Sequence, residues 1–122
     1  MIDMLTAKDA QQFAKDWCSA WNSHDLEAIL AHYADGVVLT SPTAARLMKD
    51  PRGVVNGREA LRNYFSVGLM AYPDLRFEVL DVTCGVGSLV VYYSNQNGAR
   101  VSEYMELDSG GKATKVIAHY SI

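Results

Sequence analysis

The sequence has little of what marks disulfide-rich, metal-binding or nucleic-acid-binding proteins. Its two cysteines, Cys18 and Cys84, form no Cys-x-x-Cys pair, so we expect two free thiols and no zinc or redox motif. No His-His-carboxylate spacing indicates a metal site. The net charge is −3, and no cluster of Lys or Arg offers a surface for nucleic acid. We therefore expect neither a metal nor a nucleic-acid partner.

Long apolar runs and glycine-rich motifs are also missing. No uncharged apolar stretch reaches the roughly 20 residues that cross a bilayer. The first residues include Asp3, Lys8 and Asp9 and lack the apolar core of a signal peptide, so we expect a cytoplasmic protein without membrane contact. No glycine-rich loop links a strand to a helix, and no Gly-x-Ser-x-Gly motif occurs, so the sequence predicts no nucleotide or other cofactor.

What is present is the composition of an ordinary globular domain. Hydrophobic residues make up 49% of the chain and charged residues 20%, which excludes a disordered protein. Internal repeats, linkers and low-complexity segments are absent from the sequence. We therefore expect a single domain spanning residues 1–122.

Helical periodicity dominates the first part of the chain. Thr6 followed by Asp9 is typical of a helix cap, and the pattern predicts a helix over residues 7–22. Apolar residues at the helical period give this helix one buried face: Phe13, Ala14, Trp17, Cys18 and Trp21. A shorter helix with an apolar stripe follows: Leu26, Ile29, Leu30 and Tyr33. We expect Asp35-Gly36 to end it, because glycine readily adopts the left-handed conformation that follows a helix.

The rest of the chain favours one more helix and then a sheet. Residues 37–41 are a β-branched strand that Pro42 stops. Residues 42–52 lack a strand period and form either a lid over a pocket or a packed loop, with room for one helical turn. A third helix is expected over about 58–70, and the strands come last: 75–82, 88–94, 100–107 and 113–122.

Successive strands with short turns pair as an antiparallel meander. Three helices followed by a four-strand meander give an α+β fold. The helices must cover the apolar face of the sheet, and a curved sheet over a long helix encloses a cavity.

Four segments occur in an order that resembles the NTF2-like superfamily, which includes SnoaL-like and ketosteroid-isomerase-like domains. They are WNSHDLEAILAHYADGVVLTSP, VNGREALRNYF, YPDLRFEVLDV and ELDSGGK. The resemblance covers nearly the whole chain. It implies a cystatin-like cone, in which a curved antiparallel sheet wraps over the N-terminal helix and leaves a hydrophobic pocket. Such cones host many reactions, so the fold alone does not give the function.

Comparison with ketosteroid isomerase, a member of that superfamily, implies where catalytic side chains would lie. Its tyrosine donor falls on Trp17, its aspartate base on Ser41 and its protonated aspartate on Glu103. An indole N–H cannot act as an acid, and a serine without a partner is no useful base. We therefore do not expect a true ketosteroid isomerase.

Glu103 is our candidate catalytic residue, because strand alternation sends it into the cavity. Its neighbours on that strand face are apolar: Val101, Met105 and Leu107. Loss of solvation raises the pKa of a carboxyl group, and a raised carboxyl can act as a general acid or base near neutral pH. Polyketide cyclases that resemble this fold also use an acidic group in the cavity. A purely structural role, with Glu103 paired to Arg100 or Trp17, stays open.

The apolar pattern and the resemblance together imply the lining of the pocket. It comprises Trp17, Trp21, Tyr33, Ser41, Tyr64, Met105, Ala118 and Tyr120. Alternation directs either Tyr92 or Tyr93 inward, and the sequence leaves the choice open.

The histidines are expected outside the pocket. His24 lies in a solvated capping loop, and His32 lies on the surface of the second helix. His119 points to the convex face of the sheet, where members of this superfamily commonly pair. We therefore expect a homodimer through Tyr104, Ile117 and His119.

Three functions stay open. The first is a cofactor-independent isomerase, cyclase or dehydratase that acts on a small hydrophobic carbonyl compound with Glu103 as acid or base. The second is a non-catalytic module that binds a small apolar ligand. The third is a dimerisation or interaction domain.

Overall fold

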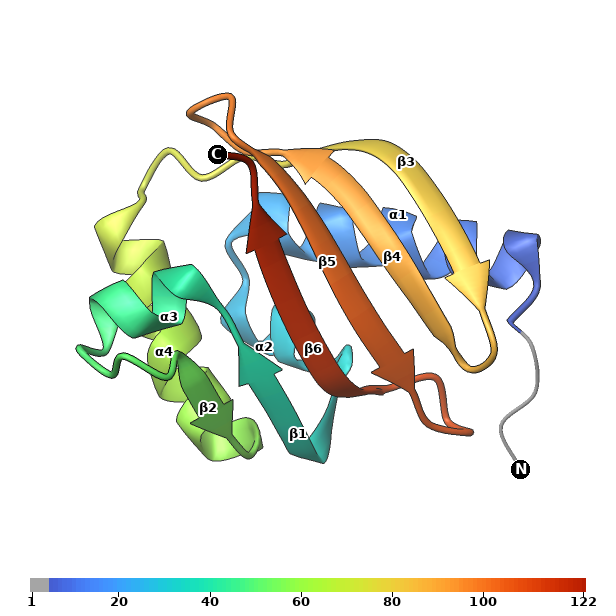
Figure 1. The fold of residues 1–122 in the computed structure, drawn as a ribbon, viewed down its shortest axis with the longest axis horizontal. Helices are drawn as coiled ribbons and strands as arrows, with labels where there is room; N and C mark the ends of the chain where they lie inside the picture. The colour runs from blue at the N-terminus through green and yellow to red at the C-terminus, as the bar shows by residue number, and fades with distance from the viewer. Residues whose placement is uncertain (1–4) are drawn as a thin grey trace.

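The computed structural model describes residues 5–122, which form a curved sheet with helices packed on one side (Figure 1). The helices are α1 (Ala7–Ser23), α2 (Leu26–Leu30), α3 (Pro42–Leu47) and α4 (Arg58–Ala71). The strands are β1 (Tyr33–Thr40), β2 (Val54–Asn56), β3 (Glu78–Gly85), β4 (Ser88–Ser94), β5 (Arg100–Leu107) and β6 (Ala113–Tyr120). The α+β class and the cystatin-like architecture are as predicted.

The sheet has the strand order β2-β1-β6-β5-β4-β3. The last four strands pair antiparallel with their neighbours in the chain, which confirms the predicted meander. One pairing lies outside the predicted meander, because β1 runs parallel to β6. This pairing joins segments that lie far apart in the chain, such as Tyr33 and Ala113, so no local pattern in the sequence could indicate it.

Helix α1 begins and buries its apolar face as predicted. The Thr6 hydroxyl oxygen accepts a hydrogen bond from the Asp9 amide at 3.1 Å and caps the helix. Trp17 and Trp21 are both buried, and the helix ends at His24, which has the left-handed φ of 59°. No helix within residues 5–122 is long and apolar enough to cross a membrane.

The second helix is shorter than predicted. It ends at Leu30, and Tyr33 is the first residue of β1 rather than part of a helical stripe. The cause is the parallel pairing with β6: the His32 carbonyl accepts from the Ala113 amide at 2.8 Å, and Tyr33 pairs with Ala113. Gly36 therefore does not end a helix; it lies where the register of this pairing shifts.

The segment 42–52, expected as a lid or a packed loop, contains helix α3. Ser41 caps this helix by accepting from the Thr43 amide at 3.1 Å. The Ser41 amide in turn donates to the Gly53 carbonyl at 2.9 Å, so the two ends of the segment are tied together. Gly53 has a φ of 64°, and a Cβ there would lie 2.5 Å from the Ser41 oxygen, so only glycine fits this approach.

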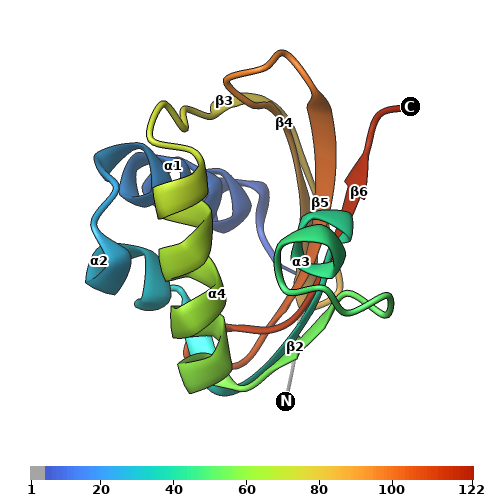
Figure 2. The same cartoon turned by 90° about the vertical axis from the view of Figure 1, so that its left-hand side faces the viewer.

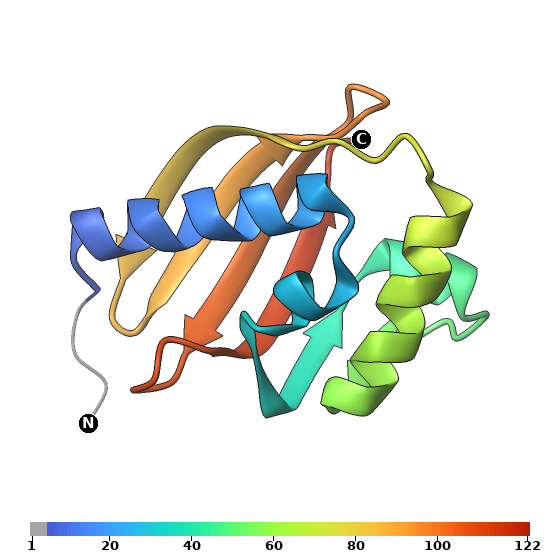
Figure 3. The ribbon, with the colours of Figure 1, turned by 180° about the vertical axis from the view of Figure 1, so that it is seen from behind.

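The two faces of the sheet differ in what covers them. Helices α1, α2 and α4 lie together on the concave side, and the opposite side carries no helix of the described residues (Figure 2). Helix α1 crosses the strands on that concave side (Figure 3). The strand alternation agrees with the prediction, because Val101, Met105, Val116 and Ala118 are buried, whereas His119 is exposed.

Candidate functional site

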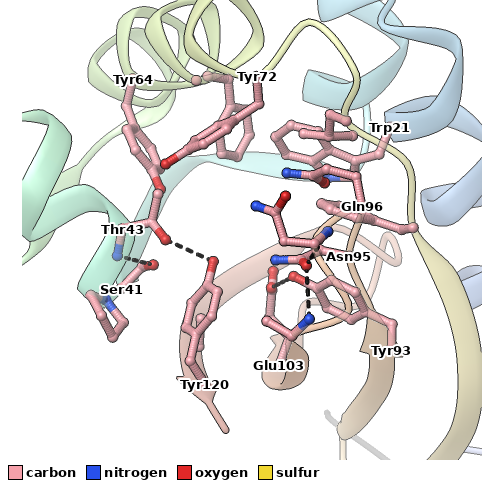
Figure 4. Close-up of a pocket in the computed structure, with 18 of the residues that line it drawn as sticks. Trp21, Ser41, Thr43, Tyr64, Tyr72, Tyr93, Asn95, Gln96, Glu103 and Tyr120 are labelled. Carbon is pink, nitrogen blue, oxygen red and sulfur yellow. Dashed lines mark hydrogen bonds between the residues drawn. The ribbon is translucent and has the colours of Figure 1, made fainter. Parts of the chain in front are cut away.

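A cavity of about 360 Å³ lies between the concave face of the sheet and helices α1, α3 and α4. Many of its lining side chains are aromatic: Trp17, Trp21, Tyr64, Phe65, Tyr72, Phe77, Tyr93 and Tyr120. Figure 4 shows side chains from the sheet, from α4 and from the loop after β4 converging on this space. Its volume falls in the range of roughly 300–1,000 Å³ that is typical of small-molecule sites.

Two side chains in this pocket are buried although they are polar or charged. Apart from tyrosine and tryptophan, Ser41 and Glu103 are the buried polar or charged residues among residues 5–122. Both line the pocket. Ser41 is explained by its role as the cap of α3, whereas a buried carboxylate is costly and needs a partner or a use.

Glu103 takes its place from strand β5, next to Ala118 of β6 and Val91 of β4. Its Oε1 accepts a hydrogen bond of 2.7 Å from the hydroxyl of Tyr93, and it forms no salt bridge with any described residue. Burial raises the pKa of Glu103 to about 7, and the Tyr93 hydrogen bond offsets this only in part. Neither Arg100 nor Trp17 is its partner, contrary to the structural alternative; Tyr93 takes that place.

The two carboxylate oxygens of Glu103 differ in their surroundings. Tyr93 holds Oε1, and the pKa of this tyrosine is well above its usual range, first because of burial and then because of the Glu103 charge. Its hydroxyl therefore keeps its proton and acts as a donor. The other oxygen has no hydrogen-bond partner among the described residues, yet it is not an enclosed atom. It faces the pocket and is free to meet a ligand.

The indoles of α1 form the wall behind Glu103. The Trp17 N–H donates to the Tyr33 hydroxyl at 2.9 Å, and its ring stacks on Phe77 with centroids 5.6 Å apart. The Trp21 N–H lies close to the same Tyr33 hydroxyl but does not reach hydrogen-bonding geometry, so this buried donor has no partner in the described part of the chain.

The α3 side of the pocket is rich in hydroxyl groups. The Thr43 hydroxyl donates to the Tyr120 hydroxyl at 2.8 Å, and Tyr64 from α4 points toward the same place (Figure 4). Burial raises the pKa of both Tyr64 and Tyr120, so both hydroxyls stay protonated. Because Tyr120 accepts from Thr43, its own proton remains available for a ligand.

Arg46 and the loop between β4 and β5 complete the rim. Arg46 on α3 donates to the Tyr72 hydroxyl at the end of α4. In the loop, the side-chain oxygen of Asn95 accepts from the Asn97 amide at 3.0 Å and from the Ala99 amide at 3.1 Å. This leaves the side-chain NH₂ group of Asn95, beside Gln96, as a further polar group at the pocket.

Most of the predicted pocket residues meet in this cavity. Those that line it are Trp17, Trp21, Ser41, Tyr64, Glu103, Ala118 and Tyr120. Two do not: Tyr33 lies behind Trp17 with a buried hydroxyl, and Met105 is fully buried in the core. Met105 was assigned to the correct strand face, but the pocket ends at Glu103, and the next inward position along β5 is already packed.

The sequence analysis left out several lining residues. Tyr93, not Tyr92, points inward, and the hairpin register explains this because Tyr93 pairs with the inward Val101. Val101 was already predicted to face inward. Extending the strand pairing back across the β4–β5 turn would have identified Tyr93 as the inward residue. Arg46, Tyr72, Asn95 and Gln96 come from a short helix, a helix end and a loop, where no periodicity marks the direction of a side chain.

The histidines and cysteines lie outside the pocket lining. His24 is not simply solvated, because its ring Nε2 lies 2.8 Å from the Leu75 carbonyl oxygen. His32 is half-buried and packs edge-on against Phe13. His119 is exposed on the convex face as predicted, and both cysteines are free thiols.

Comparison with known proteins places this architecture in a family. Residues 14–121 match the SnoaL-like domain. The chain belongs to the SnoaL-like family. Membership confirms the NTF2-like resemblance seen in the sequence. No curated protein matches the chain.

Solved structures of other SnoaL-like and related proteins agree with this assignment. A SnoaL-like protein of unknown function from Burkholderia thailandensis is 36% identical, with a TM-score of 0.93, over 98% of this chain and 100% of that one. A protein of unknown function with a cystatin-like fold from Methylobium petroleophilum is 12% identical, with a TM-score of 0.75, over 98% of this chain and 80% of that one. The epoxide hydrolase/cyclase-like enzyme SalBIII, which has a role in pyran ring formation in the polyether salinomycin, is 18% identical, with a TM-score of 0.73, over 94% of this chain and 92% of that one.

Proposed function

We propose that this SnoaL-like protein is a cofactor-independent enzyme that moves a proton on a small hydrophobic carbonyl compound, with Glu103 as its acid and base. The observation that carries the proposal is the state of Glu103. One of its oxygens is held by Tyr93, the other faces an aromatic pocket, and no cation neutralises it. An isomerase, a cyclase and a dehydratase all need a proton moved next to a carbonyl group.

The pKa of Glu103 suits both halves of such a reaction. At about 7, the carboxyl group is present in both protonation states near neutral pH. The carboxylate takes a proton from the carbon next to the carbonyl, and the C–H electron pair becomes the enolate. The resulting Glu103 acid then returns the proton to carbon or to a leaving oxygen.

Tyr120 is our candidate donor for the oxygen that becomes negative. It lies on β6, the strand next to Glu103, and its hydroxyl is oriented by Thr43. A hydroxyl fixed in this way can donate to a developing oxyanion without first reorganising.

The relatives do not decide the reaction. SalBIII takes part in pyran ring formation, but at 18% identity it shares the fold alone. The 36% identical relative from Burkholderia is itself of unknown function. We therefore infer proton transfer from the geometry of Glu103. Whether the reaction is an isomerisation, a cyclisation or a dehydration depends on the structure of the substrate. A cytoplasmic location stays a prediction.

Proton exchange tests this proposal without knowledge of the natural substrate. Small cyclic ketones in D₂O should lose the NMR signals of the protons next to the carbonyl faster when the protein is present. Glu103→Gln removes the base but keeps the side-chain shape, so it should slow this exchange by about 100-fold or more. The matched control is Glu106→Gln, which makes the same change on the opposite face of β5.

Two results would contradict the catalytic proposal. One is exchange that survives in Glu103→Gln at the wild-type rate. The other is the absence of exchange for ketones that NMR shows to be bound. The second result favours the alternative function, a module that binds a small apolar ligand and uses Glu103 and Tyr120 to orient it.

We also propose that the convex face of the sheet forms a homodimer. Ile117 and Tyr104 are half-buried there, directly opposite each other on β6 and β5, and no helix of the described residues covers them. The wild-type protein should sediment as a dimer, and Ile117→Asp should sediment as a monomer with an unchanged circular dichroism spectrum. A wild-type protein that is monomeric at all concentrations contradicts this prediction.

A further inference from the structure

The pocket has one charged group at its base and another at its rim. Among the residues that line it, Glu103 and Arg46 are the charged side chains. Glu103 projects from the sheet, whereas Arg46 belongs to α3 and is exposed. The remaining lining is uncharged and includes the aromatic side chains described above. The pocket therefore carries opposite charges at two places, with neutral polar and aromatic side chains between them.

Arg46 is held in position without being neutralised. It donates to the hydroxyl of Tyr72, a neutral partner, and this contact joins α3 to the end of α4. The salt bridges within residues 5–122 involve Arg52 and Arg62, and none includes Arg46. A guanidinium has five N–H donors in a planar fork, so most of its donors remain free for a ligand.

The groups next to Arg46 are also donors. Thr43 lies one helical turn before it on α3, and the hydroxyl of Tyr120 keeps a proton available after accepting from Thr43. Figure 4 shows Thr43, Tyr64, Tyr72 and Tyr120 facing one another on this side of the pocket. This side therefore suits a ligand group that only accepts hydrogen bonds.

We infer that the substrate is a compact hydrophobic keto acid, whose carboxylate binds Arg46 and Tyr72 at the rim while its carbonyl end reaches Glu103. This deepens the proposed function and rests on it for the reacting end of the molecule. A planar carboxylate matches the guanidinium fork with two parallel hydrogen bonds. Binding the other way round would place a carboxylate beside Glu103, where like charges repel.

A pair of probes that differ only in charge tests the role of Arg46. We would compare 4-oxocyclohexanecarboxylate with its methyl ester by calorimetric or NMR titration. The wild-type protein should bind the acid at least about tenfold more tightly than the ester, and this preference should fall as salt is added. Arg46→Gln should abolish the preference, and Arg46→Lys should restore part of it.

The control for a general change in charge is Arg52→Gln, which removes a cation from the segment that follows α3 but does not touch the pocket. It should keep the wild-type preference. Equal affinity for acid and ester, binding of neither probe at millimolar concentrations, or a preference that survives in Arg46→Gln overturns the inference.

The same probes separate this inference from the proposed function. Proton exchange in the ester as fast as in the acid, with equal affinities, means that Glu103 is catalytic and the Arg46 assignment is wrong. Tight binding of the acid through Arg46 without exchange next to its carbonyl means that the anion site is correct and the catalytic proposal is wrong.

Discussion

Replacing Trp17 by alanine should lower the free energy of unfolding by about 3–5 kcal/mol. The indole is 1% exposed and packs against three other aromatic side chains, Trp21, Phe77 and Tyr93. Its N–H also satisfies the buried Tyr33 hydroxyl. Alanine would leave a cavity in the middle of this cluster and remove that hydrogen bond.

Urea denaturation followed by circular dichroism measures this loss. Trp17→Phe is the matched variant, because it keeps an aromatic ring and removes the N–H; it should cost clearly less than alanine. A loss under about 1 kcal/mol for Trp17→Ala would show that the indole is not part of the core.

The faces of α1 and of the late strands were predictable because burial follows a short period. A helix that packs on one side repeats its apolar residues every three or four positions, and a half-buried strand repeats them every two. Together with the family resemblance, this placed Trp17, Glu103 and Tyr120 at the pocket. It could not say where along the strand the pocket ends, so Met105 was wrongly included.

The error at Tyr33 has a different cause. Leu26 to Leu30 and Tyr33 fit one helical stripe, and Asp35-Gly36 looks like a helix end. The observed strand exists because Tyr33 pairs with Ala113, eighty residues later in the chain. Contacts between such distant segments override local propensity, and a single sequence does not reveal them.

The residues at the rim of the pocket could not be predicted from the sequence, for a third reason. Arg46 and Tyr72 come together because α3 packs near the end of α4, and the Asn95 loop reaches the pocket through its own turn geometry. Side chains at helix ends and in loops have no repeating direction. Their placement depends on the packing of whole elements, which the sequence pattern does not encode locally.

Glu103 should make the stability of the protein depend on pH. Its pKa is about 7 in the folded protein and 4.5 in an unfolded chain, so between these values the folded state binds more protons. The stabilising contribution of the protonated group is complete below pH 4.5 and is lost as the pH rises through 7. Each pH unit between the two pKa values is worth about 1.4 kcal/mol. We therefore expect a loss of about 3 kcal/mol between mildly acidic and mildly alkaline solution.

Glu103→Gln isolates this contribution, because glutamine does not titrate and all other groups are the same in both proteins. Urea denaturation at several pH values should show the variant gaining about 3 kcal/mol relative to the wild type as the pH rises. Any weakening of the Tyr93 hydrogen bond in the variant shifts the comparison by a constant and does not change its slope. A difference between Glu103→Gln and wild type that does not vary with pH would mean that Glu103 is charged at neutral pH in the folded protein, and its role as an acid would then have to be abandoned.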